Sequence, residues 1–288
     1  MRLGAKVDLD LVVRSHGWYD LPPFRYDERG RILTFKTLVD GRAAQVTVQQ
    51  DGEGLAVSAG GGVTARLVMP IVRRVLDLDA DLTAFHALCR EREGEGFGWI
   101  AERGAGRILR APNPFEDAVK VLATTNCSWA LTKVISTKLI GVFDRDGTFP
   151  DAPFIAGLTE ARLRQDVSLG YRAPFLKAFA EKVASGQLDL SRWEDRSRPD
   201  EEVEQEIRAH NGFGPYAAAT LSRLLGRHGR LGLDSWSRKK IAALRFKNRK
   251  VKDARVERLY RGFGSHAGLA FWLDVTRDWH AGREALWG

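Results

Sequence analysis

Residues 201–236 read EEVEQEIRAHNGFGPYAAATLSRLLGRHGRLGLDSW and decide the fold of this chain. The first part predicts an amphipathic helix that ends at Asn211, and the compact turn GFGP (212–215) follows it. A second helix, dense in alanine, starts at Tyr216. Two glycines allow such a turn to expose backbone N–H groups at the start of a helix, where they can hold an anion. We therefore predict a helical hairpin over about residues 201–226.

Asp234 lies beyond the second helix, in the apolar and glycine-rich segment LGLDSW, and directly precedes SWSRKKIAAL, which predicts a further helix. An aspartate at this position is typical of an N-cap, because its side chain accepts hydrogen bonds from the first free N–H groups of the helix. A Gly-x-Gly turn alone is equally typical of an ordinary corner between two helices. The aspartate that follows the turn is therefore the informative feature.

A helix-hairpin-helix followed by an aspartate at this distance resembles the signature of the helix-hairpin-helix DNA glycosylases. The resemblance implies that the turn of Gly212, Phe213 and Gly214 holds the DNA backbone, and Tyr216, directly after the turn, is a further candidate DNA contact. It implies that Asp234 is catalytic, stabilising the positive charge on the deoxyribose as the base leaves and orienting or deprotonating the attacking water. Tyr216 stands where the bifunctional members carry a lysine, so the resemblance implies hydrolysis without strand cleavage.

Two upstream segments resemble the 8-oxoguanine glycosylase branch of this superfamily. In LRAPNPFEDAVKVLATTNCSWA (109–130) a predicted helix ends at TTN, and the resemblance implies that Asn126 contacts the orphaned partner base. In LGYRA (169–173) it implies that Tyr171 wedges into the base stack, while Arg172 meets the opposite base or a phosphate. The alternatives are a helix C-cap at Asn126, and a buried tyrosine with a surface arginine at a helix start.

Two departures from that branch leave the substrate open. Leu131 stands where the branch carries a cytosine-reading arginine, and SHGWYD (15–20) replaces its Gly-Gln-x-Phe-Arg-Trp element. Trp18 and Trp236 are the candidate pocket residues, because alkylated purines are cationic and stack well on indole faces. We expect an alkylated purine as the substrate, with oxidised guanine as the alternative.

The stretch SRKKIAALRFKNRKVK (237–252) contains no acidic residue and begins beside Asp234. Such a run either follows a phosphate backbone or forms a solvated cationic face. Its position next to the proposed site favours DNA contact, with Arg238 and Lys239 as candidates. The formal net charge of +8 over 288 residues fits a polyanionic partner, although charge alone does not distinguish nucleic acid from other partners.

The first third of the chain predicts strands and the remainder predicts helices. The strand-like segments are VDLDLVV (7–13), RILTFKTLV (31–39), AAQVTVQQ (43–50) and GLAVSA (54–59). From Met69 onward the apolar period becomes helical, and no strand pattern follows about residue 110. We predict an α+β fold, with a small antiparallel β-sheet domain at 1–75 and a mainly helical domain at 76–288.

Cysteine and histidine spacing gives no metal-binding pattern. Cys89 and Cys127 form no CxxC pair, and the six histidines form no HxxxH or HExxH pair. We therefore expect no cofactor and no iron–sulfur cluster, while a cation bound at the hairpin stays open. The chain shows neither a signal-peptide core nor an apolar run of membrane-spanning length. These features predict a cytoplasmic protein, nucleoid-associated if bacterial, that acts as a monomer on double-stranded DNA containing a damaged base.

Two other classes compete with the enzyme. One is a catalytically silent DNA-binding module that keeps the hairpin and the basic surface, and Asp234 argues against it because binding a polyanion needs no nearby carboxylate. The other is an interaction protein with a fortuitous hairpin. The order of Asn126, Tyr171, the 212–214 turn and Asp234 in one chain disfavours that class.

Overall fold

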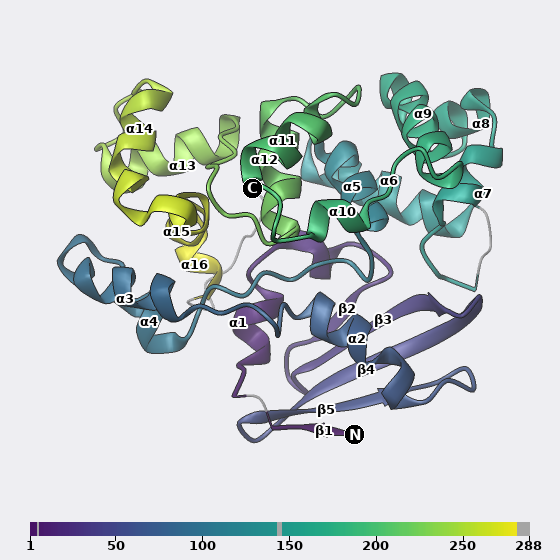
Figure 1. Ribbon diagram of the computed structural model, residues 1–288, viewed down its shortest axis with the longest axis horizontal. Helices are drawn as coiled ribbons and strands as arrows, with labels where there is room; N and C mark the ends of the chain where they lie inside the picture. Colours follow the sequence, from purple (N-terminus) through teal and green to yellow (C-terminus); the bar gives the residue numbers. More distant parts are fainter. Residues whose placement is uncertain (5, 143–145, 281–288) are drawn as a thin grey trace.

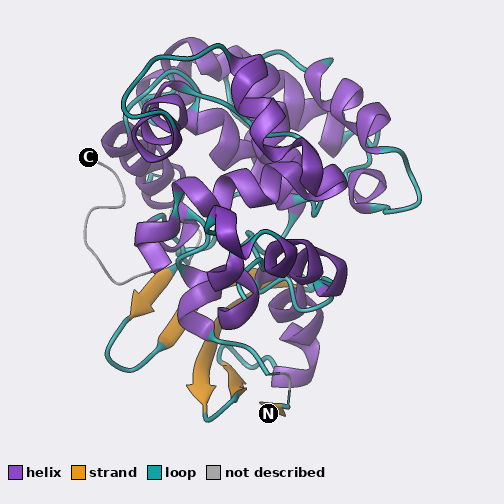
Figure 2. Ribbon diagram, turned by 90° about the vertical axis from the view of Figure 1, so that its left-hand side faces the viewer, coloured by secondary structure: helices purple, strands orange, loops and turns teal. Residues whose placement is uncertain are grey.

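The computed structural model describes residues 1–4, 6–142 and 146–280, and it confirms the predicted α+β class. A sheet near the N-terminus is followed by helices that gather above it in both ribbon views (Figures 1 and 2). The last residues of the predicted helical domain, 281–288, lie outside the described residues. No described helix combines the length and the apolar character that crossing a membrane requires.

Within the described residues the sheet has five antiparallel strands in the order β1-β5-β4-β3-β2. The strands are β1 (Arg2–Leu3), β2 (Arg25–Asp27), β3 (Ile32–Val39), β4 (Arg42–Asp51) and β5 (Gly54–Ala59). Alternate residues of β3 are buried, as expected for a sheet with one covered face. Asp40 and Gly41 connect β3 to β4 with φ values of 49° and 76°, the backbone form that a two-residue hairpin requires.

The prediction of a strand over residues 7–13 is wrong. The structure has the short helix α1 (Leu9–Val13) there, and the Asp8 side chain caps it by accepting a hydrogen bond from the Asp10 N–H at 3.0 Å. Its apolar residues include a run of three, and all are buried. A short run buried on several sides carries no period that separates a helix from a strand.

The remaining elements are helical. They are η1 (Gly17–Asp20), α2 (Ala65–Val75), α3 (Thr83–Glu91), η2 (Glu93–Glu95), α4 (Gly98–Arg103), α5 (Pro114–Thr124), α6 (Trp129–Gly141), α7 (Ala152–Gly157), α8 (Glu160–Gln165), η3 (Gly170–Arg172), α9 (Ala173–Ala184), α10 (Ser191–Glu194), α11 (Asp200–Arg208), α12 (Pro215–Leu224), α13 (Ser235–Arg245), α14 (Asp253–Tyr260), η4 (Arg261–His266), α15 (Ala267–Val275) and α16 (Arg277–His280). The sequence predicts helical periodicity from Met69 onward, and helix α2 begins four residues earlier, at Ala65.

Helices α11 and α12 form the predicted hairpin, and α13 follows Asp234 as predicted. The first helix ends at Arg208 and not at Asn211, so the turn is longer than expected. Gly212, with a φ of 92° in the left-handed region, lies within this turn and reverses the chain toward α12.

A single hydrophobic core connects the sheet to the helices, so the parts on either side of the predicted boundary at 75–76 pack against each other. A polar network crosses the same boundary. The Trp18 indole donates to Asp117 on α5 at 2.7 Å, and the Arg74 guanidinium donates to the same carboxylate at 3.0 Å. Asp117 is fully buried, so this network fixes the N-terminal segment onto the helical part.

Candidate active site

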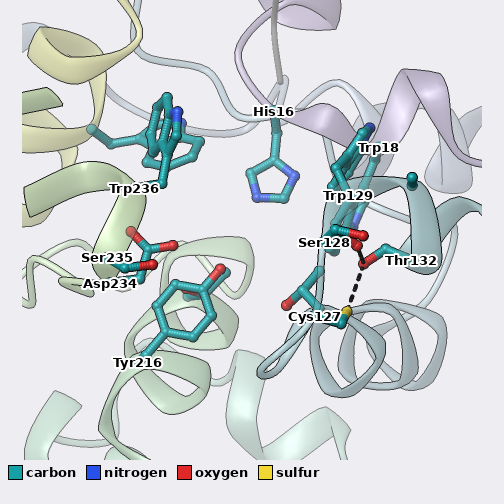
Figure 3. Close-up of a pocket in the computed structure, with 14 residues that line it drawn as sticks. His16, Trp18, Cys127, Ser128, Trp129, Thr132, Tyr216, Asp234, Ser235 and Trp236 are labelled. Carbon is teal, nitrogen blue, oxygen red and sulfur yellow. Dashed lines mark hydrogen bonds between the residues drawn. The ribbon is translucent and has the colours of Figure 1, made fainter. Parts of the chain in front are cut away.

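A cavity of about 350 Å³ opens between the hairpin, residues 16–18 at the start of η1 and the start of α6 (Figure 3). It is lined by His16, Trp18, Thr124, Cys127, Ser128, Trp129, Ala130, Thr132, Tyr216, Thr220, Asp234, Ser235, Trp236 and Trp272. Its volume lies in the range of small-molecule sites and suits one base. Asp234 and the predicted pocket residues Trp18 and Trp236 therefore surround one space.

Asp234 is the N-cap of α13 and also faces the cavity. Its Oδ1 accepts a hydrogen bond from the Ser237 N–H at 2.7 Å, and its own N–H donates to Ser237 Oγ at 2.9 Å. This reciprocal capping box fixes the carboxylate at the end of the helix. No described residue donates a hydrogen bond to Oδ2, so one oxygen is available to a group inside the cavity.

Tyr216, in the first turn of α12, reaches into the same cavity (Figure 3). The DNA contact predicted for Tyr216 would therefore lie inside this cavity and not on the exposed turn. Burial, and then the nearby Asp234 carboxylate, raise the pKa of the Tyr216 hydroxyl. The phenol therefore stays protonated at neutral pH and can donate a hydrogen bond beside Asp234.

Four indole rings form most of the apolar lining, those of Trp18, Trp129, Trp236 and Trp272. Trp18 is held by Asp117, as described above, and Trp129 Nε1 donates to Asp20 at 2.8 Å. Trp272 Nε1 donates to the Ser15 carbonyl at 2.7 Å, and its ring lies 6.2 Å from that of Trp236. Hydrogen bonds thus fix the planes of at least three of these rings before any ligand enters.

His16 reaches into the cavity between these indoles (Figure 3). Its ring lies edge-on to Trp18 at 4.2 Å and 5.6 Å from Trp272. Burial, helped by the charges of Arg223 and Lys120, lowers the pKa of His16 to about 3. Its side chain is therefore a neutral imidazole at physiological pH.

Arg223 on α12 is a buried cation behind the wall of the cavity. Its guanidinium lies over one face of Trp272, 4.6 Å from the ring centre, and Nη2 donates to the Leu231 carbonyl at 2.9 Å. Burial lowers its pKa to about 10, while Tyr216 and Asp234 oppose that shift. No described carboxylate lies within ion-pair distance of this guanidinium, so its charge is balanced only at longer range.

Lys120, the other buried cation near the cavity, is paired. Its Nζ lies 2.6 Å from Glu116 Oε1 and 4.8 Å from the centre of the Phe24 ring, and the side chain is fully buried. No lysine is among the residues that line the cavity. Within the described part of the chain, the cavity therefore presents no free amine.

The two glycines of the hairpin turn differ in whether their surroundings leave room for a side chain. A Cβ on Gly212 would lie 2.4 Å from Leu122 Cδ1, and its φ is 92°, so packing and backbone both demand glycine. A Cβ on Gly214 would meet nothing within 4 Å. Gly214 is the N-cap of α12 and has no capping side chain, so the first N–H groups of this helix face outward.

The Phe213 side chain lies in the core, whereas the predicted DNA contact of this turn is assigned to its backbone. The ring is only 2% exposed and lies 5.3 Å from Phe179 in the core, and its N–H donates to the His210 carbonyl at 3.1 Å. The sequence placed Phe213 between two glycines, and a core anchor is the physical reason for an aromatic residue there.

Asn126 and Tyr171 lie together on the surface, although they are 45 residues apart. Asn126 Nδ2 donates to the Tyr171 hydroxyl at 3.2 Å, and both side chains are exposed. Arg172 is 4% exposed, and its guanidinium donates to the Thr125 carbonyl and to Thr125 Oγ1. This burial corrects the expectation that Arg172 meets the opposite base or a phosphate; its guanidinium instead ties the Tyr171 turn to the Asn126 turn.

The two candidate basic residues on α13 are exposed beyond Asp234. Arg238 forms a two-pronged ion pair with Asp253, with both N–O distances at 2.8 Å. Lys239 is exposed, and no described carboxylate lies within ion-pair distance of it. Lys239 is therefore the freer of the two cations.

Sequence reasoning did not assign His16, Trp129 or the polar residues Cys127, Ser128 and Thr132 to the pocket. These residues come from the turn before η1 and from the start of α6, which follows the Asn126 turn directly. The Cys127 thiol donates to the Ala123 carbonyl at 2.9 Å and lies 3.3 Å from Thr132 Oγ1, so it is held within its own turn. No local spacing in the sequence marks these segments as neighbours of Asp234. Among the described residues no group of three or more histidine, cysteine or acidic side chains could hold a metal ion.

No protein-family model and no curated protein matches this sequence. Solved structures do match. The 3-methyladenine DNA glycosylase from Archaeoglobus fulgidus shares 18% sequence identity at a TM-score of 0.77, covering 98% of this chain and 100% of that one. MBOgg1 in complex with a low-affinity DNA ligand shares 20% identity at a TM-score of 0.73, covering 95% and 93%.

The 8-oxoguanine glycosylase/lyase of Clostridium acetobutylicum, in complex with double-stranded DNA containing cytosine opposite 8-oxoguanine, is similar over 97% of this chain and 94% of that chain. The sequence identity is 18% and the TM-score is 0.70. Together these likenesses show that the chain has the fold of the helix-hairpin-helix DNA glycosylases, the fold that its sequence motifs resemble.

Proposed function

We propose that this protein is a monofunctional DNA glycosylase of base excision repair, which removes damaged purines from double-stranded DNA. One observation carries the proposal: Asp234 presents an unpartnered carboxylate oxygen at a cavity walled by indoles, directly after a hairpin. A base cannot enter such a cavity from within a duplex, so the damaged nucleotide is extruded into it. The glycosylase structures that share the fold support a DNA glycosylase.

The chemistry assigned to the cavity is hydrolysis of the N-glycosidic bond. The bond electrons leave with the base, and positive charge grows on the deoxyribose ring. The Asp234 carboxylate stabilises that charge and accepts a proton from the water whose oxygen bonds to C1′. Helix α13 holds the carboxylate in place through the capping box, so little reorganisation is needed during the reaction.

The outer surface suits a DNA backbone and a distorted duplex. The first N–H groups of α12 face outward at Gly214, and a helix N-terminus with free N–H groups binds phosphate well. The protein itself leaves room for a side chain at Gly214. A close approach of the DNA backbone is therefore a reason why this position has none. Asn126 and Tyr171 form the paired projection that we assign to the gap left by the extruded base.

Water, and not an amine, is the proposed nucleophile. Tyr216 occupies the wall where a Schiff-base lysine would be needed, and a phenol cannot form an imine. Lys120 is paired with Glu116 and lies behind the Trp18 ring, 6.0 Å from its centre. The product we expect is an intact strand with an abasic site, and no cofactor enters this reaction.

Two substrate classes remain, and a different observation favours each. The four indoles favour an alkylated purine, because a cationic base stacks well on electron-rich rings. The Arg223 guanidinium favours a neutral lesion such as 8-oxoguanine, because it already occupies one face of Trp272 and repels a second cation. We place alkylated purines first and oxidised guanine second.

A panel of duplexes tests this function, each containing one lesion: 7-methylguanine, 1,N6-ethenoadenine, hypoxanthine or 8-oxoguanine. After incubation each sample is divided, one half is treated with hot alkali, and a parallel reaction contains borohydride. We expect strand breaks only after alkali and no trapped covalent adduct, with Asp234→Asn inactive on the same lesions. Binding without excision of any lesion would show a silent DNA-binding module, and efficient trapping would show that a lysine reaches C1′.

A further inference from the structure

His16 is a buried polar side chain that the hydrolysis described above does not use. It is 4% exposed, and its Nδ1 has no hydrogen-bond partner in the described structure. A buried ring nitrogen without a partner destabilises the folded protein, because it has lost its hydrogen bonds to water and gained none. A phenylalanine would fill nearly the same volume without that cost. Because the His16 side chain also lines the cavity, a ligand bound there can supply the missing partner.

The surroundings of His16 show where that partner lies. Its ring is fixed by an edge-on contact with Trp18 at 4.2 Å and by Trp272 at 5.6 Å, and both indoles line the same cavity. Figure 3 shows the imidazole pointing into the cavity between Trp236 on one side and Trp18 with Trp129 on the other. A flat ligand stacked between those walls would present its polar edge to His16.

The chemistry of the side chain defines what it can recognise. A neutral imidazole offers one N–H donor and one acceptor lone pair, in the plane of the ring. Purine edges carry ring nitrogens and exocyclic groups that complement either atom. Since His16 is buried among indole rings, a base that satisfies it gains over one that leaves it unpaired.

We propose that His16 is a specificity-determining residue that hydrogen-bonds the polar edge of the extruded purine lesion. The proposal rests on the glycosylase function proposed above and names the side chain that selects among bases. Asp234 acts at the sugar and is indifferent to the base, whereas His16 contacts the base and not the sugar. The structure thus divides reaction and selection between two residues on different sides of the cavity.

The test replaces His16 by phenylalanine and compares it with the same change at His280. His280 is also buried, neither of its ring nitrogens has a partner among the described residues, and it packs 5.5 Å from Trp99, outside the cavity. We expect His16→Phe to fold with an unchanged or higher melting temperature and to lose at least ten-fold in single-turnover excision of the best lesion. His280→Phe should lose less than two-fold. A loss below ten-fold at His16, or an equal loss at His280, would overturn the proposal.

A second measurement does not depend on how the phenylalanine variant folds. The wild-type protein is given paired substrates that differ in one hydrogen-bonding group of the base, such as purine and 7-deazapurine versions of the same lesion. We expect at least one such deletion to slow excision ten-fold in the wild type, and His16→Gln, which keeps a donor and an acceptor, to retain more activity than His16→Phe. Equal rates for all pairs would overturn the role of His16 and leave the proposed glycosylase function standing. No excision of any lesion by the wild type would overturn the glycosylase function itself.

Discussion

The two sides of the cavity are built in different ways and carry different chemistry. The hairpin wall consists of Tyr216, Asp234 and Trp236, which lie close together in the sequence and include the free carboxylate oxygen. The opposite wall, here the recognition wall, consists of His16, Trp18 and Trp129 and carries no charge. We infer that the hairpin wall performs the reaction on the sugar and that the recognition wall selects the base.

The largest effect is expected from Asp234→Asn, which tests the chemical half of this division. Asparagine also caps helices well, so the fold should be kept while the negative charge is lost. Excision should fall by at least about 100-fold on every lesion that the wild type removes. Single-turnover rates measure excision, and gel shifts measure DNA affinity separately.

DNA binding by the Asp234→Asn variant should stay equal or become tighter, because a carboxylate near phosphates is removed. The control is Asp79→Asn, which removes a surface carboxylate paired with Arg73 and should leave excision unchanged. If Asp234→Asn slowed one lesion strongly and another hardly at all, the hairpin wall would also select the base, and the division between the walls would be wrong.

Gly212→Ala tests how the hairpin wall is anchored to the rest of the molecule. Alanine must adopt the left-handed φ of 92°, and its Cβ would lie 2.4 Å from Leu122 Cδ1 on α5. The backbone strain and the close contact together should lower the free energy of unfolding by about 3 kcal/mol. Urea unfolding measures the change, with Gly214→Ala as a control that should stay within about 0.5 kcal/mol. A neutral Gly212→Ala would mean that the hairpin moves freely against α5.

The hairpin wall was predictable from the sequence because its information is local. The turn glycines, the aspartate and the start of α13 follow each other within one stretch, and each has a known backbone reason. The structure confirmed the N-cap position of Asp234 and the α+β class. The burial of the Phe213 ring was not predicted, because whether an aromatic residue in a turn faces solvent or core depends on α9, which packs there.

The recognition wall was not predictable in the same way, because long-range packing assembles it. Trp18 is held by Asp117 on α5, which also binds Arg74 on α2, and Trp129 is held by Asp20. No spacing in the sequence encodes that network. Arg172 failed for a related reason: its acceptor is a carbonyl on a distant turn, so a residue expected at the surface is buried.

The pH dependence of stability tests the state of the recognition wall. The folded pKa of His16 is about 3, below the unfolded value of 6.5, so the unfolded chain takes up a proton first as the pH falls. His16 therefore leaves the free energy of unfolding unchanged with pH above pH 6.5 and lowers it progressively as the pH falls from 6.5 to about 3. By pH 5 the loss is about 2 kcal/mol.

Other groups titrate in the same range, so the measurement is a difference. Burial raises the pKa of Glu116, which acts in the opposite direction, and lowers that of His280 to about 4. Urea unfolding of the wild type and of His16→Phe at pH 7.5 and pH 5 cancels these common contributions. We expect the variant to gain about 2 kcal/mol relative to the wild type on acidification. Parallel pH curves would mean that His16 is already protonated or exposed.

Gly214→Asp should have the smallest effect of the four, and it tests the outer end of the hairpin wall. An aspartate at this N-cap has open space and can accept hydrogen bonds from the free N–H groups of α12, so the folded protein should be equally stable or slightly more stable. The same charge would face the DNA phosphate that we assign to these N–H groups. Affinity for DNA should then fall by about ten-fold for every sequence alike, and the loss should shrink as salt screens the repulsion. Gly214→Asn supplies a similar cap without the charge and isolates the electrostatic part. An equal loss in both variants would mean that bulk alone is excluded at this contact, whereas no loss in either would place the phosphate elsewhere and leave the hairpin wall without its contact to DNA.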